Sequence, residues 1–167
     1  MENEFLKIVN HPLRFRLYLL WKLPAAFLSG LRVEPTTLES STVRISLHWL
    51  SQNPFRSIYF ASLAMAAEMS TGVLAMARIY KKKPAVSMLV VSMESQFFKK
   101  ATGTIRFICN DGPLFEKTVH TAMETGESVT LVATSTGTNS HGEVVARFVF
   151  TWSFRRKIVN LLVLQSK

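Results

Sequence analysis

The sequence of 167 residues lacks a cysteine pair for a disulfide, a spaced set of metal ligands and a glycine-rich phosphate-binding loop. Its single cysteine, Cys109, excludes an internal disulfide and favours a reducing compartment, so we expect a cytoplasmic protein. The histidines are scattered without ligand spacing to Cys109, which predicts no metal site. There is also no P-loop, no GxGxxG and no serine nucleophile elbow, and no cofactor is expected.

Acidic residues are scarce. Eleven Asp and Glu stand against twenty Lys and Arg, for a net charge of +9. The cations gather in short runs: Lys81–Lys83, Lys99 with Lys100, and Arg155–Lys157. Such runs suit the phosphates of coenzyme A, nucleic acid or anionic lipid, and they also occur as simple solvated charge. Because no nucleic-acid motif with interleaved aromatics accompanies them, we expect no nucleic-acid partner.

Apolar residues are abundant, at 48% with a mean hydropathy of +0.19, which excludes a disordered chain. No secretory signal is expected, because the first residues mix charges and lack an apolar run. Residues 57–77 carry one charge, Glu68, and as a helix would reach about 30 Å, the thickness of a bilayer. The chain has no second such stretch and has clean two-sided strands, so we interpret 57–77 as a core helix and expect no integral membrane span.

The hydrophobic periodicity predicts one α+β domain with extensions at both ends. Residues 1–30 are predicted to be a helical extension, in which Leu13, Leu17, Leu20 and Trp21 recur at helical spacing. That helix packs on the domain's own sheet or, being basic and amphipathic, lies on a membrane surface. Residues 31–157 then form an antiparallel sheet wrapped around one long helix, and 158–167 form a C-terminal tail. Strands are expected within 31–49 and at 85–98, 104–109, 127–136 and 143–154.

Glu68 is the chemically unusual residue, a carboxylate in the middle of an apolar helix. Burial raises the pKa of a carboxyl group, which could make Glu68 a base near neutral pH. Its helical neighbours are mostly small and leave room for a ligand: Ala61, Ala64, Thr71 and Gly72. The structural alternative is a salt bridge to Arg56, Arg78 or Arg106. A methionine-rich stripe beside it is typical of core and also of adaptable acyl pockets: Met65, Met69, Val73 and Met76.

The run Asn53–Gly72, NPFRSIYFASLAMAAEMSTG, resembles the loop and central helix of hotdog-fold thioesterases. The similarity is to the phenylacetate-degradation-type branch and a related domain of unknown function. In that branch a loop Asn precedes an HGG that opens the helix, and an acid follows nine residues after the His. Here Asn53 matches the Asn, Tyr59–Ala61 stand at the HGG and Glu68 stands at the acid, and the resemblance covers roughly residues 30–155.

This resemblance implies hydrolysis of acyl-CoA or another acyl thioester. Glu68 would activate water or attack the carbonyl, the N–H of Phe60 would stabilise the oxyanion, and Asn53 would orient the water or the acid. Substrate contacts are expected from residues around them: Tyr59, Ala61, Ala64, Met65, Thr71 and Gly72. The family forms homodimers with two sites at the interface, often doubled into tetramers. Because Tyr59–Ala61 depart from HGG, a non-catalytic acyl-ligand or interaction module is the second hypothesis.

Overall fold

The computed structural model describes residues 3–157, which form five helices and six strands. Three short helices come first, α1 (Glu4–Val9), α2 (Pro12–Lys22) and α3 (Pro24–Leu28). The remaining elements follow in chain order: β1 (Arg32–Val33), β2 (Ser41–Ser46), α4 (Phe60–Ile79), β3 (Val86–Phe97), β4 (Thr104–Cys109), α5 (Gly112–Thr125), β5 (Val129–Thr138) and β6 (Val144–Arg156). The predicted tail, 158–167, lies outside the described residues.

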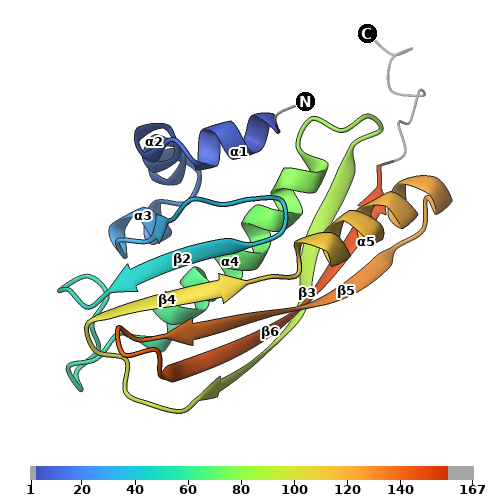
Figure 1. Cartoon of the computed structure of the whole chain (residues 1–167). Helices are drawn as coiled ribbons and strands as arrows, with labels where there is room; N and C mark the ends of the chain where they lie inside the picture. The colour runs from blue at the N-terminus through green and yellow to red at the C-terminus, as the bar shows by residue number, and fades with distance from the viewer. Residues whose placement is uncertain (1–2, 158–167) are drawn as a thin grey trace, which may run out of the picture.

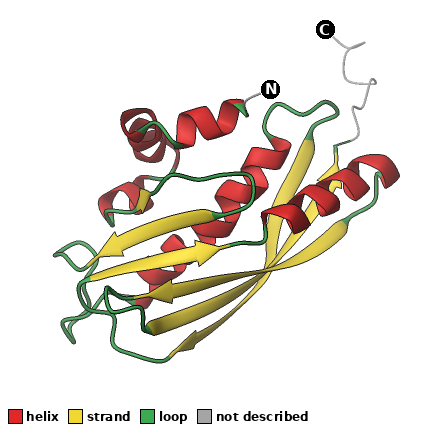
Figure 2. Ribbon diagram, viewed as in Figure 1, coloured by secondary structure: helices red, strands yellow, loops and turns green. Residues whose placement is uncertain are grey.

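The strands form one antiparallel sheet in the order β1-β2-β4-β5-β6-β3. This sheet curves around α4, and α5 lies beside α4 on the same side (Figure 1, Figure 2). The α+β class and the sheet around one long helix are therefore confirmed. Residues 114–125, where no strand was expected, belong to helix α5.

Alternation along the strands builds the core between the sheet and α4. In β4, Ile105, Phe107 and Cys109 are buried, while Arg106 points to solvent. In β6 the inward side chains are mostly aromatic, and the rings of Phe148 and Phe107 meet edge to face at 5.7 Å. Burial raises the pKa of Cys109 to about 12, which keeps the thiol protonated and makes Cys109 a core residue rather than a nucleophile.

Helix α4 passes the length and composition test for a membrane span, yet it is a core helix. Of its most apolar 18-residue window, 67% is buried inside the domain. It contacts β2, β4, β5 and β6 along its length. An apolar helix that is enclosed on most sides needs no lipid to cover it.

The N-terminal helices pack on α4 through a different face from the one predicted. Phe15 and Leu19 of α2 are buried, and Asn3 at the start of α1 donates its side-chain amide to the carbonyl of Ala77 at 2.7 Å. The predicted stripe is exposed instead, so its packing on the sheet was wrong: Leu13, Leu17, Leu20 and Trp21. Helix α2 has apolar side chains on two faces, and the periodicity alone did not show which one is buried.

Candidate active site

The loop before α4 is organised by Asn53. Its Oδ1 accepts hydrogen bonds from the N–H of Phe55 at 3.0 Å, the N–H of Ser57 at 3.2 Å and the hydroxyl of Ser57 at 3.1 Å. Tyr59 closes the loop by donating its N–H to the carbonyl of Ser51 at 2.7 Å, in an extended conformation that leads into the helix. The structure therefore gives Asn53 a role in shaping this loop.

The first turn of α4 presents unused backbone donors. The N–H groups of Ser62 and Leu63 donate to the carbonyl of Tyr59, at 2.9 and 3.2 Å. Within residues 3–157, the N–H groups of Phe60 and Ala61 donate no hydrogen bond. Such donors, together with the positive end of the helix dipole, favour a negative charge near this terminus.

A hollow of about 340 Å³ lies at this terminus. It is lined by loop, helix and sheet residues, among them Asn53, Tyr59, Phe60, Leu63, Lys99 and Lys100. The rings of Tyr59 and Phe60 meet edge to face at 4.9 Å and are about half exposed. Lys99 forms an ion pair with Glu143, so part of the positive charge at this mouth is already neutralised. We call this the N-terminal hollow.

Glu68 lies in a second hollow, of about 90 Å³, between α4 and the N-terminal helices. Its other walls are almost entirely apolar: Phe5, Phe15, Tyr18, Leu23, Met69, Gly72, Val73, Met76 and Met88. We call this the Glu68 hollow. Loss of solvation raises the pKa of the Glu68 carboxyl group above its ordinary value. An added Cβ on Gly72 would lie 3.2 Å from Glu68 Oε1, so the carboxylate lies over the glycine one turn further on.

Across the described residues, the Glu68 carboxylate has neither an ion pair nor a hydrogen bond. The structural alternative for Glu68, a salt bridge to Arg56, Arg78 or Arg106, is therefore wrong. Arg78 pairs with Glu116 at 3.1 Å, and Arg106 pairs with Glu34 at 3.0 Å. A carboxyl group without a partner in an apolar hollow is poorly solvated in its charged form.

A single chain does not bring the predicted catalytic groups together. Glu68 follows Phe60 by eight residues on one helix, which is about 12 Å along the axis. Asn53 and Phe60 line the N-terminal hollow, and neither lines the Glu68 hollow. One small carbonyl group cannot contact both the Glu68 carboxylate and the Phe60 amide of the same chain.

The expected substrate contacts divide in the same way. Tyr59 lines the N-terminal hollow and Gly72 lines the Glu68 hollow. Ala61, Ala64 and Met65 line neither and lie partly exposed along α4.

Thr71 has a structural role, because its hydroxyl is hydrogen-bonded within the core. Its hydroxyl is fully buried, accepts from Trp152 Nε1 at 3.0 Å and donates to the backbone carbonyl of Glu68 at 2.9 Å. Both hydrogen-bonding roles of the hydroxyl are thus filled from within the protein, which leaves it unavailable to a substrate.

Sequence reasoning missed the N-terminal contribution to the Glu68 hollow. Phe5, Phe15 and Tyr18 come from α1 and α2, outside the segment that carries the motif resemblance. The available signal was the spacing of Phe15 and Leu19, one helical turn apart and opposite the more conspicuous leucine stripe.

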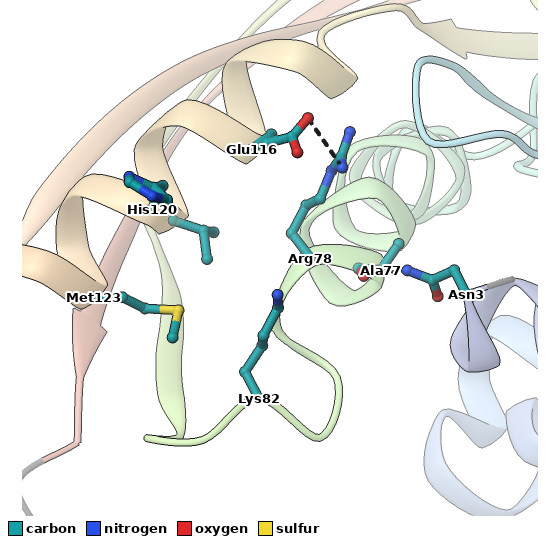
Figure 3. A pocket seen from close by; sticks show the side chains of 8 residues that line it. Asn3, Ala77, Arg78, Lys82, Glu116, His120 and Met123 are labelled. Carbon is teal, nitrogen blue, oxygen red and sulfur yellow. Dashed lines mark hydrogen bonds and ion pairs between the residues drawn. The ribbon is translucent and has the colours of Figure 1, made fainter. Parts of the chain in front are cut away.

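A third hollow, of about 160 Å³, lies between the C-terminal half of α4 and α5 (Figure 3). Arg78 is its central side chain, paired with Glu116, and the labelled Lys82, His120 and Met123 surround the space. None of the predicted site residues lines it. Within residues 3–157, no group of three or more His, Cys, Asp or Glu side chains lies close enough to hold a metal ion.

An antiparallel sheet wrapped around one long helix defines the hotdog class of proteins, as the sequence predicted. Within that class, the chain belongs to the family called Domain of unknown function (DUF4442), whose model matches residues 19–154. No curated protein matches the chain significantly.

Solved structures resemble this chain over nearly its whole length. A protein of unknown function from Pseudomonas aeruginosa, described as a probable thioesterase, is 25% identical, with a TM-score of 0.72 over 87% of this chain and 97% of that one. A protein of unknown function from Chlorobaculum tepidum is 15% identical, with a TM-score of 0.73 over 89% and 99%. A thioesterase from Haemophilus influenzae is 10% identical, with a TM-score of 0.63 over 87% and 92%. The latter two likenesses show the fold alone.

Proposed function

We propose that the protein hydrolyses acyl thioesters, with Glu68 as the general base or nucleophile. The observation that carries this proposal is the carboxyl group of Glu68, unpartnered among the described residues, in an apolar hollow that raises its pKa. A carboxylate with a raised pKa accepts a proton more readily near neutral pH. The thioesterase described from Haemophilus influenzae and the P. aeruginosa protein share the fold, which supports the same reaction class.

In the base-catalysed form of the reaction, Glu68 takes a proton from water while the water oxygen bonds to the acyl carbonyl carbon. The carbonyl oxygen becomes an oxyanion, which the free N–H of Phe60 at the start of α4 can stabilise. The oxyanion then collapses, the C–S bond breaks, and the departing thiolate takes the proton from Glu68. The products are a carboxylic acid and a thiol.

Because Phe60 and Glu68 are about 12 Å apart on one helix, the proposed site combines Glu68 of one copy with the Phe60 amide of a second. A homodimer would thus carry two such sites, and a dimer of dimers would carry four. The partly exposed face of α4 would meet the partner in this arrangement: Ala61, Ala64 and Met65. Small side chains permit the close approach of two helices.

The edge strand β3 supports a dimer. It has twelve residues and no proline, and among residues 3–157 it pairs with β6 alone. Its apolar side chains are largely exposed: Leu89, Val91, Met93 and Phe97. A long apolar edge favours pairing with another strand, and pairing with β3 of a second copy would join the two sheets.

The proposed substrate is an acyl-CoA or a related thioester. The N-terminal hollow, at about 340 Å³, falls within the usual range of ligand pockets, whereas the Glu68 hollow is much smaller. Lys100 at its mouth suits the phosphates of coenzyme A, whereas Lys99 is already paired with Glu143. We also propose a cytoplasmic location, because the single, buried Cys109 needs no oxidising compartment.

The first test is Glu68→Gln, assayed with a panel of acyl-CoAs by release of the thiol. Gln has nearly the same shape but cannot accept the proton, so turnover should fall by roughly 10²–10⁴-fold. Glu127→Gln, at an exposed acid outside both hollows, is the matched control and should keep wild-type turnover. Unchanged hydrolysis by Glu68→Gln would remove the proposed mechanism.

The second test addresses the backbone donor. Phe60→Pro deletes the N–H at the first helical position, where proline is well tolerated, while Phe60→Ala keeps the N–H and removes only the ring. Phe60→Pro should lose activity and Phe60→Ala should retain it. If the site is shared, coexpressing Glu68→Gln with Phe60→Pro should restore activity, since one of the two sites in a mixed dimer is intact.

A non-catalytic acyl-binding module is the second candidate, favoured by the loop before α4. The Tyr59 and Phe60 rings line the hollow at the helix start, where the resembled family has histidine and glycine, and Asn53 Oδ1 is occupied by its own loop. Calorimetric binding of a non-hydrolysable acyl-CoA analogue, combined with no thiol release from the matching acyl-CoA, would select this candidate.

A further inference from the structure

Helix α2 presents an apolar face to solvent. Leu13, Leu17, Leu20 and Trp21 follow one another at intervals of four, three and one residues, which places them on one side of the helix. They are 64%, 57%, 49% and 82% exposed, and Trp21 is the most exposed large apolar side chain among residues 3–157. Phe15 and Leu19 on the opposite side are buried against the domain. We call the exposed side the α2 face.

The α2 face lies at the outside of the molecule. Figure 1 shows α2 at the edge of the domain, remote from β5 and β6. It takes no part in the N-terminal hollow. Leu28 of α3 is 53% exposed and adds a further apolar side chain to the layer formed by α1, α2 and α3, which we call the N-terminal layer.

The segment that carries this face is rich in positive charge and contains no acid. Residues 5–33 contain five cations and no Asp or Glu: Lys7, Arg14, Arg16, Lys22 and Arg32. Arg14 and Lys22 are exposed, and neither has an ion-pair partner within the described part of the chain. Arg16 lies with its guanidinium 4.0 Å from the centre of the Phe27 ring, which holds it beside the helix.

We propose that the α2 face docks the protein on an anionic phospholipid bilayer. Aliphatic side chains in the centre, a tryptophan at the border and flanking cations are the pattern of a helix that lies in the plane of a membrane surface. The indole of Trp21 suits the headgroup region, where one side of the ring is apolar and the N–H is hydrated.

A second copy fits this face less well than a lipid surface does. A twofold dimer through the α2 face would bring two cationic α2 helices together, and residues 5–33 offer no acid to neutralise them. An anionic membrane supplies both the apolar interior and the negative charge. This proposal is independent of catalysis, because neither Glu68 nor the Phe60 amide belongs to the α2 face.

The test uses the full chain and sedimented vesicles of phosphatidylcholine with about 30% phosphatidylglycerol, compared with vesicles of phosphatidylcholine alone. We expect binding to the anionic vesicles, weakening as NaCl rises from about 0.1 M to 0.5 M. The double variant Leu17→Glu/Trp21→Glu should bind at least about tenfold more weakly, because its charges enter the acyl boundary. Arg14→Gln/Lys22→Gln should lose the preference for anionic vesicles.

The matched control is Trp49→Glu/Leu114→Glu, which changes a tryptophan and a leucine that are 80% and 48% exposed outside the N-terminal layer. It should bind vesicles like the wild type. All these side chains are exposed, so each variant should keep the wild-type circular dichroism and Tm. Glu68→Gln should also bind normally, which separates this proposal from the enzymatic one.

Three outcomes would overturn the proposal. One is the absence of vesicle binding, and another is equal binding by the α2-face double variant and its control. The third is a wild-type oligomer that Leu17→Glu/Trp21→Glu dissociates in the absence of any vesicle binding, which would make the α2 face a protein interface.

Discussion

Glu68 connects the proposed chemistry to stability at the scale of a single residue. It lies against apolar side chains, and no described residue offers it a hydrogen bond or a counter-ion. Desolvation penalises its charged form, so the native carboxyl group holds its proton to a higher pH than the unfolded one. The same property that would make it a base therefore costs stability when it ionises.

Glu68→Gln should change the pH dependence of stability. Below the ordinary pKa of 4.5 the carboxyl group is protonated in both states, and its titration costs nothing. As the pH rises past that value the unfolded chain ionises first, so the wild type loses stability until the native carboxyl group ionises too. The variant lacks this loss, and its advantage over the wild type should grow from pH 4 to pH 8.

Urea denaturation at several pH values between these limits measures the effect. Glu127→Gln is the control, because it removes an exposed carboxylate that lies outside both hollows. A stability difference between Glu68→Gln and the wild type that stays constant with pH would show that the native pKa is not raised.

Gly112 illustrates what the sequence could and could not say about one residue. The run Asn110–Pro113 correctly predicts a break after the strand that ends at Cys109. It does not reveal why glycine stands there. A Cβ on Gly112 would lie 2.1 Å from the carbonyl oxygen of Leu38, a residue far away in the chain. That close approach exists only after β2 and β4 have paired.

At the scale of elements, β3 is an edge strand with exposed apolar side chains, and among the described residues one of its two sides is unpaired. The sequence predicts it as 85–98 and the structure has it as Val86–Phe97, so its existence was predictable from the run of Val and Met. Its position at the edge was not, because strand order depends on pairing between distant segments. The strand order is what makes β3 an edge strand, and therefore a surface that a second copy can pair with.

We predict that Met93→Lys weakens the proposed dimer. Met93 is 44% exposed on β3, and a lysine there would place a positive charge on the apolar edge of both copies. Size-exclusion chromatography with light scattering should show a shift from dimer to monomer at low protein concentration. Val132→Lys, at a 57% exposed position on the inner strand β5, should leave the assembly unchanged. If the wild type is itself a monomer, the proposed active site between two copies is ruled out.

At the scale of the whole molecule, the N-terminal helices and the sheet share one core. Phe5, Phe15 and Leu19 belong to the same buried cluster as α4 and the sheet. The family model also begins inside α2, at residue 19. A segment that contributes buried side chains to the common core should unfold together with it.

Leu19→Ala and Leu20→Ala, at adjacent residues, test this cooperativity. Leu19 is 1% exposed and Leu20 is 49% exposed. Removing the buried side chain should cost roughly 2–5 kcal/mol of the free energy of unfolding, while the exposed one should cost little. Both variants should unfold in one transition, seen alike by far-ultraviolet circular dichroism and by tryptophan fluorescence. A separate early transition in Leu19→Ala would make residues 1–30 an independent unit.

The sequence by itself determined the long central helix, the main strands, the fold class and the unusual position of Glu68, since helical and strand periods and an isolated charge are local properties. Tertiary structure decided which face of α2 is buried, since both faces are apolar and only contact with α4 distinguishes them. It also decided that Glu68 lacks a salt bridge: Arg78 and Arg106, two of the three arginines considered for it, pair instead with Glu116 and Glu34. The separation of Glu68 from the Phe60 amide follows from the rise of one helix, and it makes a second chain part of the proposed site.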